Sequence, residues 1–159
     1  MHFEGEHLLI GKIGHFFVLL AFVSSLLATI SNFTASKKVS TIEGSSWLNL
    51  ARWSYLLQTV AVLVVFTCIF IICSNHYIEY LYAYKHTSKE LEFKYLFASI
   101  WEDQGGSFLL WSIWNSVLGL FFIARNRKDA GRWEAPVMTI FSLAQVFLSL
   151  MIMGVYFFD

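Results

Sequence analysis

The sequence is poor in charge, proline and cysteine, and each scarcity excludes a class of protein. Only 14% of the 159 residues are charged, whereas a typical soluble domain has about 25%. One proline and no Ser/Gly/Pro-rich tract exclude a mainly disordered chain. Eleven basic residues balance eleven acidic ones, so the basic excess of a nucleic-acid binder is missing. Two cysteines supply neither a disulfide framework nor a zinc site.

Apolar residues make up 57% of the chain, and their distribution predicts the fold. Four stretches contain no Asp, Glu, Lys or Arg: residues 14–33, 54–75, 107–124 and 136–158. A hydrocarbon core about 30 Å thick requires about 20 apolar helical residues to cross it. We therefore predict an all-α, polytopic membrane protein with four transmembrane helices over these ranges. The first is not expected to be a cleaved signal peptide, because acidic residues precede it and no A-x-A site follows.

The basic residues between these spans predict the orientation of the chain in the membrane. With the first and third connections inside, seven Lys and Arg residues lie on the cytoplasmic side and four on the other. The excess of basic residues marks the cytoplasmic side. We expect the N-terminus, the long second connection and the C-terminus to be extracytoplasmic. Trp47, Trp53 and Trp133 would then flank helices at the inner interface, where indole rings are favoured.

Residues 101–111 (WEDQGGSFLLW) form the most informative segment. Its polar and glycine-containing half predicts a hinge that leads into the third span. Ser107 suits the N-cap of that helix, where its hydroxyl would satisfy a backbone amide. Trp111 and Trp114 are three residues apart and share a helix face. From the residues alone, a plain loop-to-helix junction with an aromatic belt explains the same pattern.

Three segments together resemble the N-terminal part of the CcmF-type cytochrome c haem lyases. They are YAYKHTSKELEFKY, ASIW and QGGSFLLW, at residues 82–95, 98–101 and 104–111. The family carries Ser-x-x-x-Leu-Pro-x-x-Tyr-Lys followed by Trp-x-Gly-x-Glu-Gly-Ser-Leu-Leu-Leu-Trp, and the GHF run at residues 14–16 looks like its start. This sequence departs from the pattern in several places: Glu92 stands in place of Pro, Phe93-Lys94 in place of the following pair, Asp103 in place of Gly and Gly105 in place of Glu.

The resemblance implies a role in cytochrome c maturation at the bacterial inner membrane. It implies haem as cofactor, with a haem chaperone, apocytochrome c and thiol-reducing maturation subunits as partners. It makes one set of residues a candidate haem or partner surface: Trp101, Gln104, Gly105, Gly106, Ser107 and Trp111. The family's later Trp-Gly-x-Trp-x-Trp-Asp segment does not occur here. We therefore expect an N-terminal fragment or split half of a longer lyase, and the alternative is a small membrane scaffold or transport subunit without haem chemistry.

Histidines and cysteines supply no further chemistry that we would assign from the sequence. All five histidines lie on or near the expected outer side: His2, His7, His15, His76 and His86. We interpret them as interfacial, with a His15–His76 haem site as the alternative. This chain alone is not expected to bind haem tightly, and we identify no catalytic acid, base or nucleophile and no metal site. Cys68 and Cys73 are expected to pack in the second span.

Uncharged polar residues within the spans favour hydrogen bonds between helices. Gln58 lies in the second span, and Ser142, Gln145 and Ser149 lie in the fourth. Gln145 and Ser149 are four residues apart and share one face of their helix. Interhelical hydrogen bonding is a better explanation of these residues than contact with a substrate.

Overall fold

The computed structural model describes residues 8–39, 41–75, 104–126 and 133–158, and all of these form helices or the turns beside them. Four helices are present: α1 (Leu8–Lys37), α2 (Ile42–Ser74), α5 (Gln104–Asn126) and α6 (Glu134–Phe158). Each is long and apolar enough to cross a membrane. The predicted all-α fold with four spans is confirmed, and the chain is a multi-pass membrane protein.

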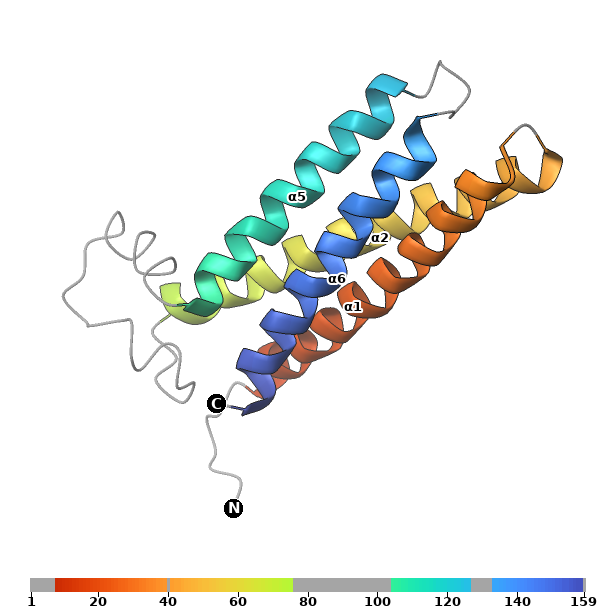
Figure 1. Cartoon of the computed structure of the whole chain (residues 1–159). Coiled ribbons are helices and arrows are strands. Elements are labelled where there is room, and N and C mark those ends of the chain that lie inside the picture. The colour runs from red at the N-terminus through yellow and green to blue at the C-terminus, as the bar shows by residue number, and fades with distance from the viewer. Residues whose placement is uncertain (1–7, 40, 76–103, 127–132, 159) are drawn as a thin grey trace.

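The helices form a bundle in which consecutive helices run in opposite directions (Figure 1). The packed pairs are α1 with α2, α2 with α5, α5 with α6, and α6 with α1, which closes a ring of four. The starts of α1 and α5 and the ends of α2 and α6 therefore lie at one end, which we call the α5-start end. The α1–α2 turn lies at the opposite end, where the longer helices α1 and α2 extend beyond α5 and α6 (Figure 1).

The helices continue past the charge-free stretches from which the spans were predicted. The second span was predicted to begin at residue 54, yet α2 begins at Ile42. Thr41 caps it, because the Thr41 hydroxyl accepts a hydrogen bond from the Gly44 amide at 3.0 Å. The turn also requires glycine at position 44, since a Cβ there would overlap the carbonyl of Lys38.

The bundle is apolar outside and partly polar inside, which is the arrangement expected in lipid. Large apolar side chains are exposed along all four helices, including Phe16, Leu57, Phe121 and Ile140. Such extensive exposed apolar surface is typical of a membrane-contacting protein. The buried residues include many serines together with Asn32, Gln58 and Gln145. Backbone groups are satisfied within each helix, so the interior side chains decide how the helices pair.

Candidate functional site

Only part of the segment proposed from the sequence as a haem or partner surface lies within the described residues. Trp101 and Asp103 lie outside the described residues, and α5 begins directly at Gln104. The prediction that Ser107 caps the helix is therefore wrong, because Ser107 is already the fourth residue of α5. The predicted hinge is likewise helical from Gln104 onward. Gly106 is buried in the bundle, so packing outweighs the low helix propensity of the two glycines.

Within α5 this segment contributes to both the core and the outer surface. Leu109 is 1% exposed and belongs to the apolar core, whereas Trp111 is 67% exposed. Trp114 is 59% exposed, and the expectation that the two tryptophans share a face is confirmed. The start of α5 is thus anchored from inside by Leu109 and carries an outward aromatic surface.

Trp111 and Trp114 belong to the wall of an open groove of about 580 Å³ between α5 and α6. Ligand pockets commonly have volumes of roughly 300–1,000 Å³, so the groove is large enough for a substantial partner. Its lining is apolar except for one carboxamide: Leu110, Trp111, Trp114, Asn115, Leu118, Ala144, Phe147 and Leu148. None of these side chains is an axial ligand used for haem iron.

A hydrogen-bonded network fills the interior beside this groove. Asn115 donates through Nδ2 to the Phe141 carbonyl at 3.1 Å and to Gln145 Oε1 at 2.8 Å. Gln145 in turn donates to the hydroxyl of Ser112. These contacts tie α5 to α6, and they confirm the interhelical role expected of Gln145. Asn115 was missed by sequence reasoning, although it is the one carboxamide in the third charge-free stretch.

A second set of polar contacts joins the α1–α2 pair to the α5–α6 pair. Gln58 Nε2 donates to the Ser116 hydroxyl at 3.3 Å, and Asn32 Nδ2 lies 3.4 Å from the Ser142 hydroxyl. Interhelical bonding is therefore confirmed for Gln58 and Ser142. Gln58 Oε1 has no partner among the described residues, although the residue is fully buried.

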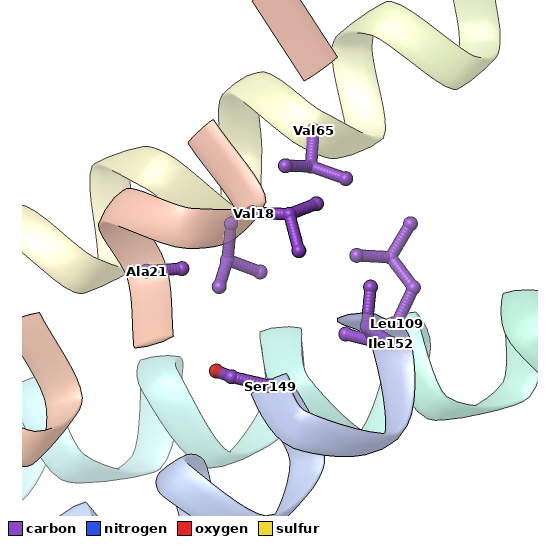
Figure 2. A pocket seen from close by; sticks show the side chains of 7 residues that line it. Val18, Ala21, Val65, Leu109, Ser149 and Ile152 are labelled. Atoms are coloured by element: carbon purple, nitrogen blue, oxygen red, sulfur yellow. The ribbon is translucent and has the colours of Figure 1, made fainter. Parts of the chain in front are cut away.

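Ser149 differs from the other polar residues of α6 because its hydroxyl has no partner among the described residues. The expectation of an interhelical hydrogen bond at Ser149 is wrong. The serine lines a small cavity of about 10 Å³ between all four helices, where every other lining residue is apolar (Figure 2). A buried water needs two to four polar partners, and this cavity offers one hydroxyl from its side chains. Apolar packing on α1, α2 and α5 has left Ser149 without an acceptor.

A buried ion pair joins α2 to α6 at the end opposite the start of α5. Arg52 Nε lies 2.6 Å from Glu134 Oε1, and Arg52 Nη2 lies 2.6 Å from Glu134 Oε2. The Glu134 side chain is 1% exposed and that of Arg52 is 22% exposed. Glu134 is also the first residue of α6, where the helix dipole favours a carboxylate. This pairing could not be predicted from the sequence, because the partners are 82 positions apart.

One histidine and both cysteines lie among the described residues. His15 is exposed on α1, and the other four histidines lie outside the described residues, so the His15–His76 alternative stays untested. Cys68 and Cys73 are buried free cysteines, which confirms their predicted packing role. No group of His, Cys, Asp and Glu in the described helices is placed to hold a metal ion.

The chain was compared with protein-family models, with curated proteins and with solved structures. None of the three comparisons finds a match. The proposals below therefore rest on the sequence and on the geometry of the bundle.

Proposed function

We propose that the chain is the N-terminal membrane part of a cytochrome c haem lyase, which supports haem delivery and covalent attachment to apocytochrome c. The observation that carries the proposal is the QGGSFLLW motif at residues 104–111, together with its location. The motif forms the first two turns of α5, with Leu109 held in the core and Trp111 turned outward. A family motif at a helix start that presents an aromatic ring suits a recognition surface.

The proposed role of this surface is stacking and positioning, not ligation of iron. The indole of Trp111 offers a flat apolar face on which a porphyrin or a partner aromatic side chain could stack. Gln104, Gly105, Gly106 and Ser107 build the helix end that holds this ring, and Trp101 belongs to the same sequence motif. Haem would be the cofactor of the complete lyase, with its iron ligands supplied outside the described residues of this chain.

The proposed orientation agrees with this role. With the N-terminus outside, the α5-start end faces the extracytoplasmic side of the bacterial inner membrane. The lyases that the chain resembles attach haem on that side, where the haem chaperone, apocytochrome c and the thiol-reducing subunits meet. The same orientation places the Arg52–Glu134 pair and the exposed Trp133 toward the cytoplasm, in keeping with the excess of basic residues there.

The experiment is a substitution of Trp111 by alanine in a complete lyase that contains this segment. Trp133→Ala is the matched control, because Trp133 is 71% exposed at the opposite end of the bundle. We expect Trp111→Ala to lower cytochrome c maturation about tenfold, by loss of a stacking face. Trp133→Ala should leave maturation unchanged. Haem staining reports the mature cytochrome, and immunoblotting reports the amount of the lyase.

Two outcomes would count against the proposal. Normal maturation with Trp111→Ala would make the start of α5 a simple helix entrance, and it would favour the scaffold or transport subunit. Disappearance of the Trp111→Ala protein from the membrane would assign the residue to folding.

A further inference from the structure

The α5–α6 groove contains an indole whose N–H group has no hydrogen-bond acceptor among lipid tails, and this indole lies near the middle of the predicted span. The third charge-free stretch spans residues 107–124, so Trp114 lies close to its centre. Tryptophan is favoured at the membrane interfaces, where its N–H meets water or headgroups. Trp114 is 59% exposed, and its N–H donates to none of the described residues. An unpaired donor in hydrocarbon is unfavourable, which points to a partner inside the membrane.

The same groove holds a matching unpaired acceptor. Asn115 uses its Nδ2 group for the Phe141 carbonyl and for Gln145. Its Oδ1 atom accepts no hydrogen bond from the described residues, and Asn115 lines the groove directly beside Trp114. A free donor and a free acceptor therefore lie at one depth on one face. Because they are neighbours along α5, they also lie at the same depth in any second copy with the same orientation.

The spacing of exposed side chains on α5 and α6 also suits packing against another pair of helices. Large exposed apolar residues on α5 lie at positions 111, 114, 117, 118 and 121, and those on α6 lie at 140, 143, 147 and 150, so residues three or four apart line one side of each helix. This alternation of three and four residues produces the ridges that pack by knobs into holes. Between the two ridges lies the groove, with Ala144 as its small residue. Small residues let helices approach closely in membranes.

We propose that the α5–α6 face is the interface of a homodimer, in which the two copies are related by a twofold axis along the membrane normal. The Trp114 indole of each copy enters the groove of the other and donates to its Asn115 Oδ1. A twofold interface must be self-complementary, and this face carries projecting indole, groove, donor and acceptor at one depth. The dimer does not depend on the lyase proposal.

Sedimentation equilibrium of the full chain in density-matched detergent tests the proposal. The wild-type protein should show a reversible monomer–dimer equilibrium. Trp114→Ala should raise the dimer dissociation constant at least about tenfold, as expected of a tryptophan at the centre of an interface. Trp114→Phe keeps a ring but removes the N–H, so it should give a smaller increase. Trp53→Ala is the control, because Trp53 is 70% exposed on α2 and lies outside the groove.

Two results would overturn the homodimer. One is a wild-type chain that stays monomeric at every concentration. The other is an equal loss of dimer in Trp53→Ala and Trp114→Ala, since detergent effects would then explain both.

Cross-linking in membranes decides the question if Trp114→Ala fails to fold. A tagged Trp111→Cys chain is produced together with a differently tagged Phe147→Cys chain, because these exposed residues lie on opposite walls of the groove at about the same depth. An oxidant should join the two chains by a disulfide bond. The control pair, Val23→Cys with Leu63→Cys, places exposed cysteines on α1 and α2 and should remain uncross-linked. Absence of the groove cross-link would exclude the proposed interface.

Discussion

The phenol of Tyr55 on α2 packs against the backbone of Gly119 on α5. A Cβ atom at position 119 would lie 2.7 Å from Tyr55 Cε1 and still closer to the Tyr55 hydroxyl. The tyrosine is fully buried, and its hydroxyl donates to the Asn115 carbonyl at 2.8 Å. Glycine therefore allows α5 to accept a large aromatic residue and a hydrogen bond on the same face. This contact fixes how α2 and α5 approach each other.

The first prediction concerns the space at Gly119. Gly119→Ala should destabilise the bundle by about 1–3 kcal/mol, because the new methyl group overlaps the phenol ring and forces α2 and α5 apart. The thermal midpoint for loss of soluble protein in detergent measures the change. The double variant Gly119→Ala/Tyr55→Leu should recover part of the loss, since the smaller side chain leaves room for the methyl group. Gly154→Ala is the control, because a Cβ there meets nothing within 4 Å. Equal effects of the two alanines would contradict the packing argument.

The second prediction concerns the Arg52–Glu134 ion pair. Removing one partner leaves the other charge buried and unpaired, which typically costs about 3–5 kcal/mol in a fully buried pair. Arg52→Ala should be the more harmful change, because it strands a carboxylate that is 1% exposed. The exposed Lys38–Glu43 pair is the control, and Lys38→Ala should alter stability by about 1 kcal/mol or less. A double-mutant cycle that finds no coupling between Arg52 and Glu134 would show that the pair contributes nothing.

The third prediction concerns the unpaired hydroxyl of Ser149. Ser149→Ala should stabilise the protein by roughly 1 kcal/mol, because it removes a buried polar group that has no partner among the described residues. Ser112→Ala should have the opposite sign, since it takes away the acceptor used by Gln145. Both are measured by thermal unfolding in the same detergent. A loss of stability in Ser149→Ala would mean that the hydroxyl has a partner that the described residues do not include.

The fourth prediction concerns the orientation of the bundle. Ser46→Cys, at the exposed start of α2, should be protected from a membrane-impermeant thiol reagent in intact cells. Lys12→Cys, near the start of α1, should react under the same conditions. The native Cys68 and Cys73 are buried and should give little background. Reaction of Ser46→Cys from outside would reverse the proposed topology.

The fifth prediction concerns haem binding by this chain alone. We expect no stoichiometric Soret band after purification in detergent and washing, because the sequence predicts histidines near one interface and no pair of them within the membrane. A persistent Soret band that His15→Ala abolishes would contradict the expectation and would restore His15 as a ligand. A band that survives this substitution would place the ligands elsewhere in the chain.

The spans could be predicted from the sequence because the absence of charge over about 20 residues has one simple cause, which is contact with hydrocarbon. The start of α2 could not, because Thr41 and Gly44 form a cap by local geometry while charged residues continue along the helix. The interhelical role of Gln58 and Gln145 followed from their polarity, but their partners on α5 depend on helix rotation. The groove arises only when α5 and α6 pack together. Sequence analysis therefore identified its two tryptophans on α5 but not the residues of α6 that form the opposite wall.

The polar contacts between the two hairpins have a consequence for the order in which the protein is made. Asn32, Arg52 and Gln58 each donate a hydrogen bond to a residue of α5 or α6. After α1 and α2 leave the translocon, these side chains have no partners on α5 or α6 until residues 75–158 have been synthesised. At roughly 5–20 residues per second this interval lasts about 4–17 s. During that time Arg52 and the two carboxamides lack their interhelical partners, so we expect an insertase or a quality-control protease that recognises such groups to bind the half-made protein before α6 is complete.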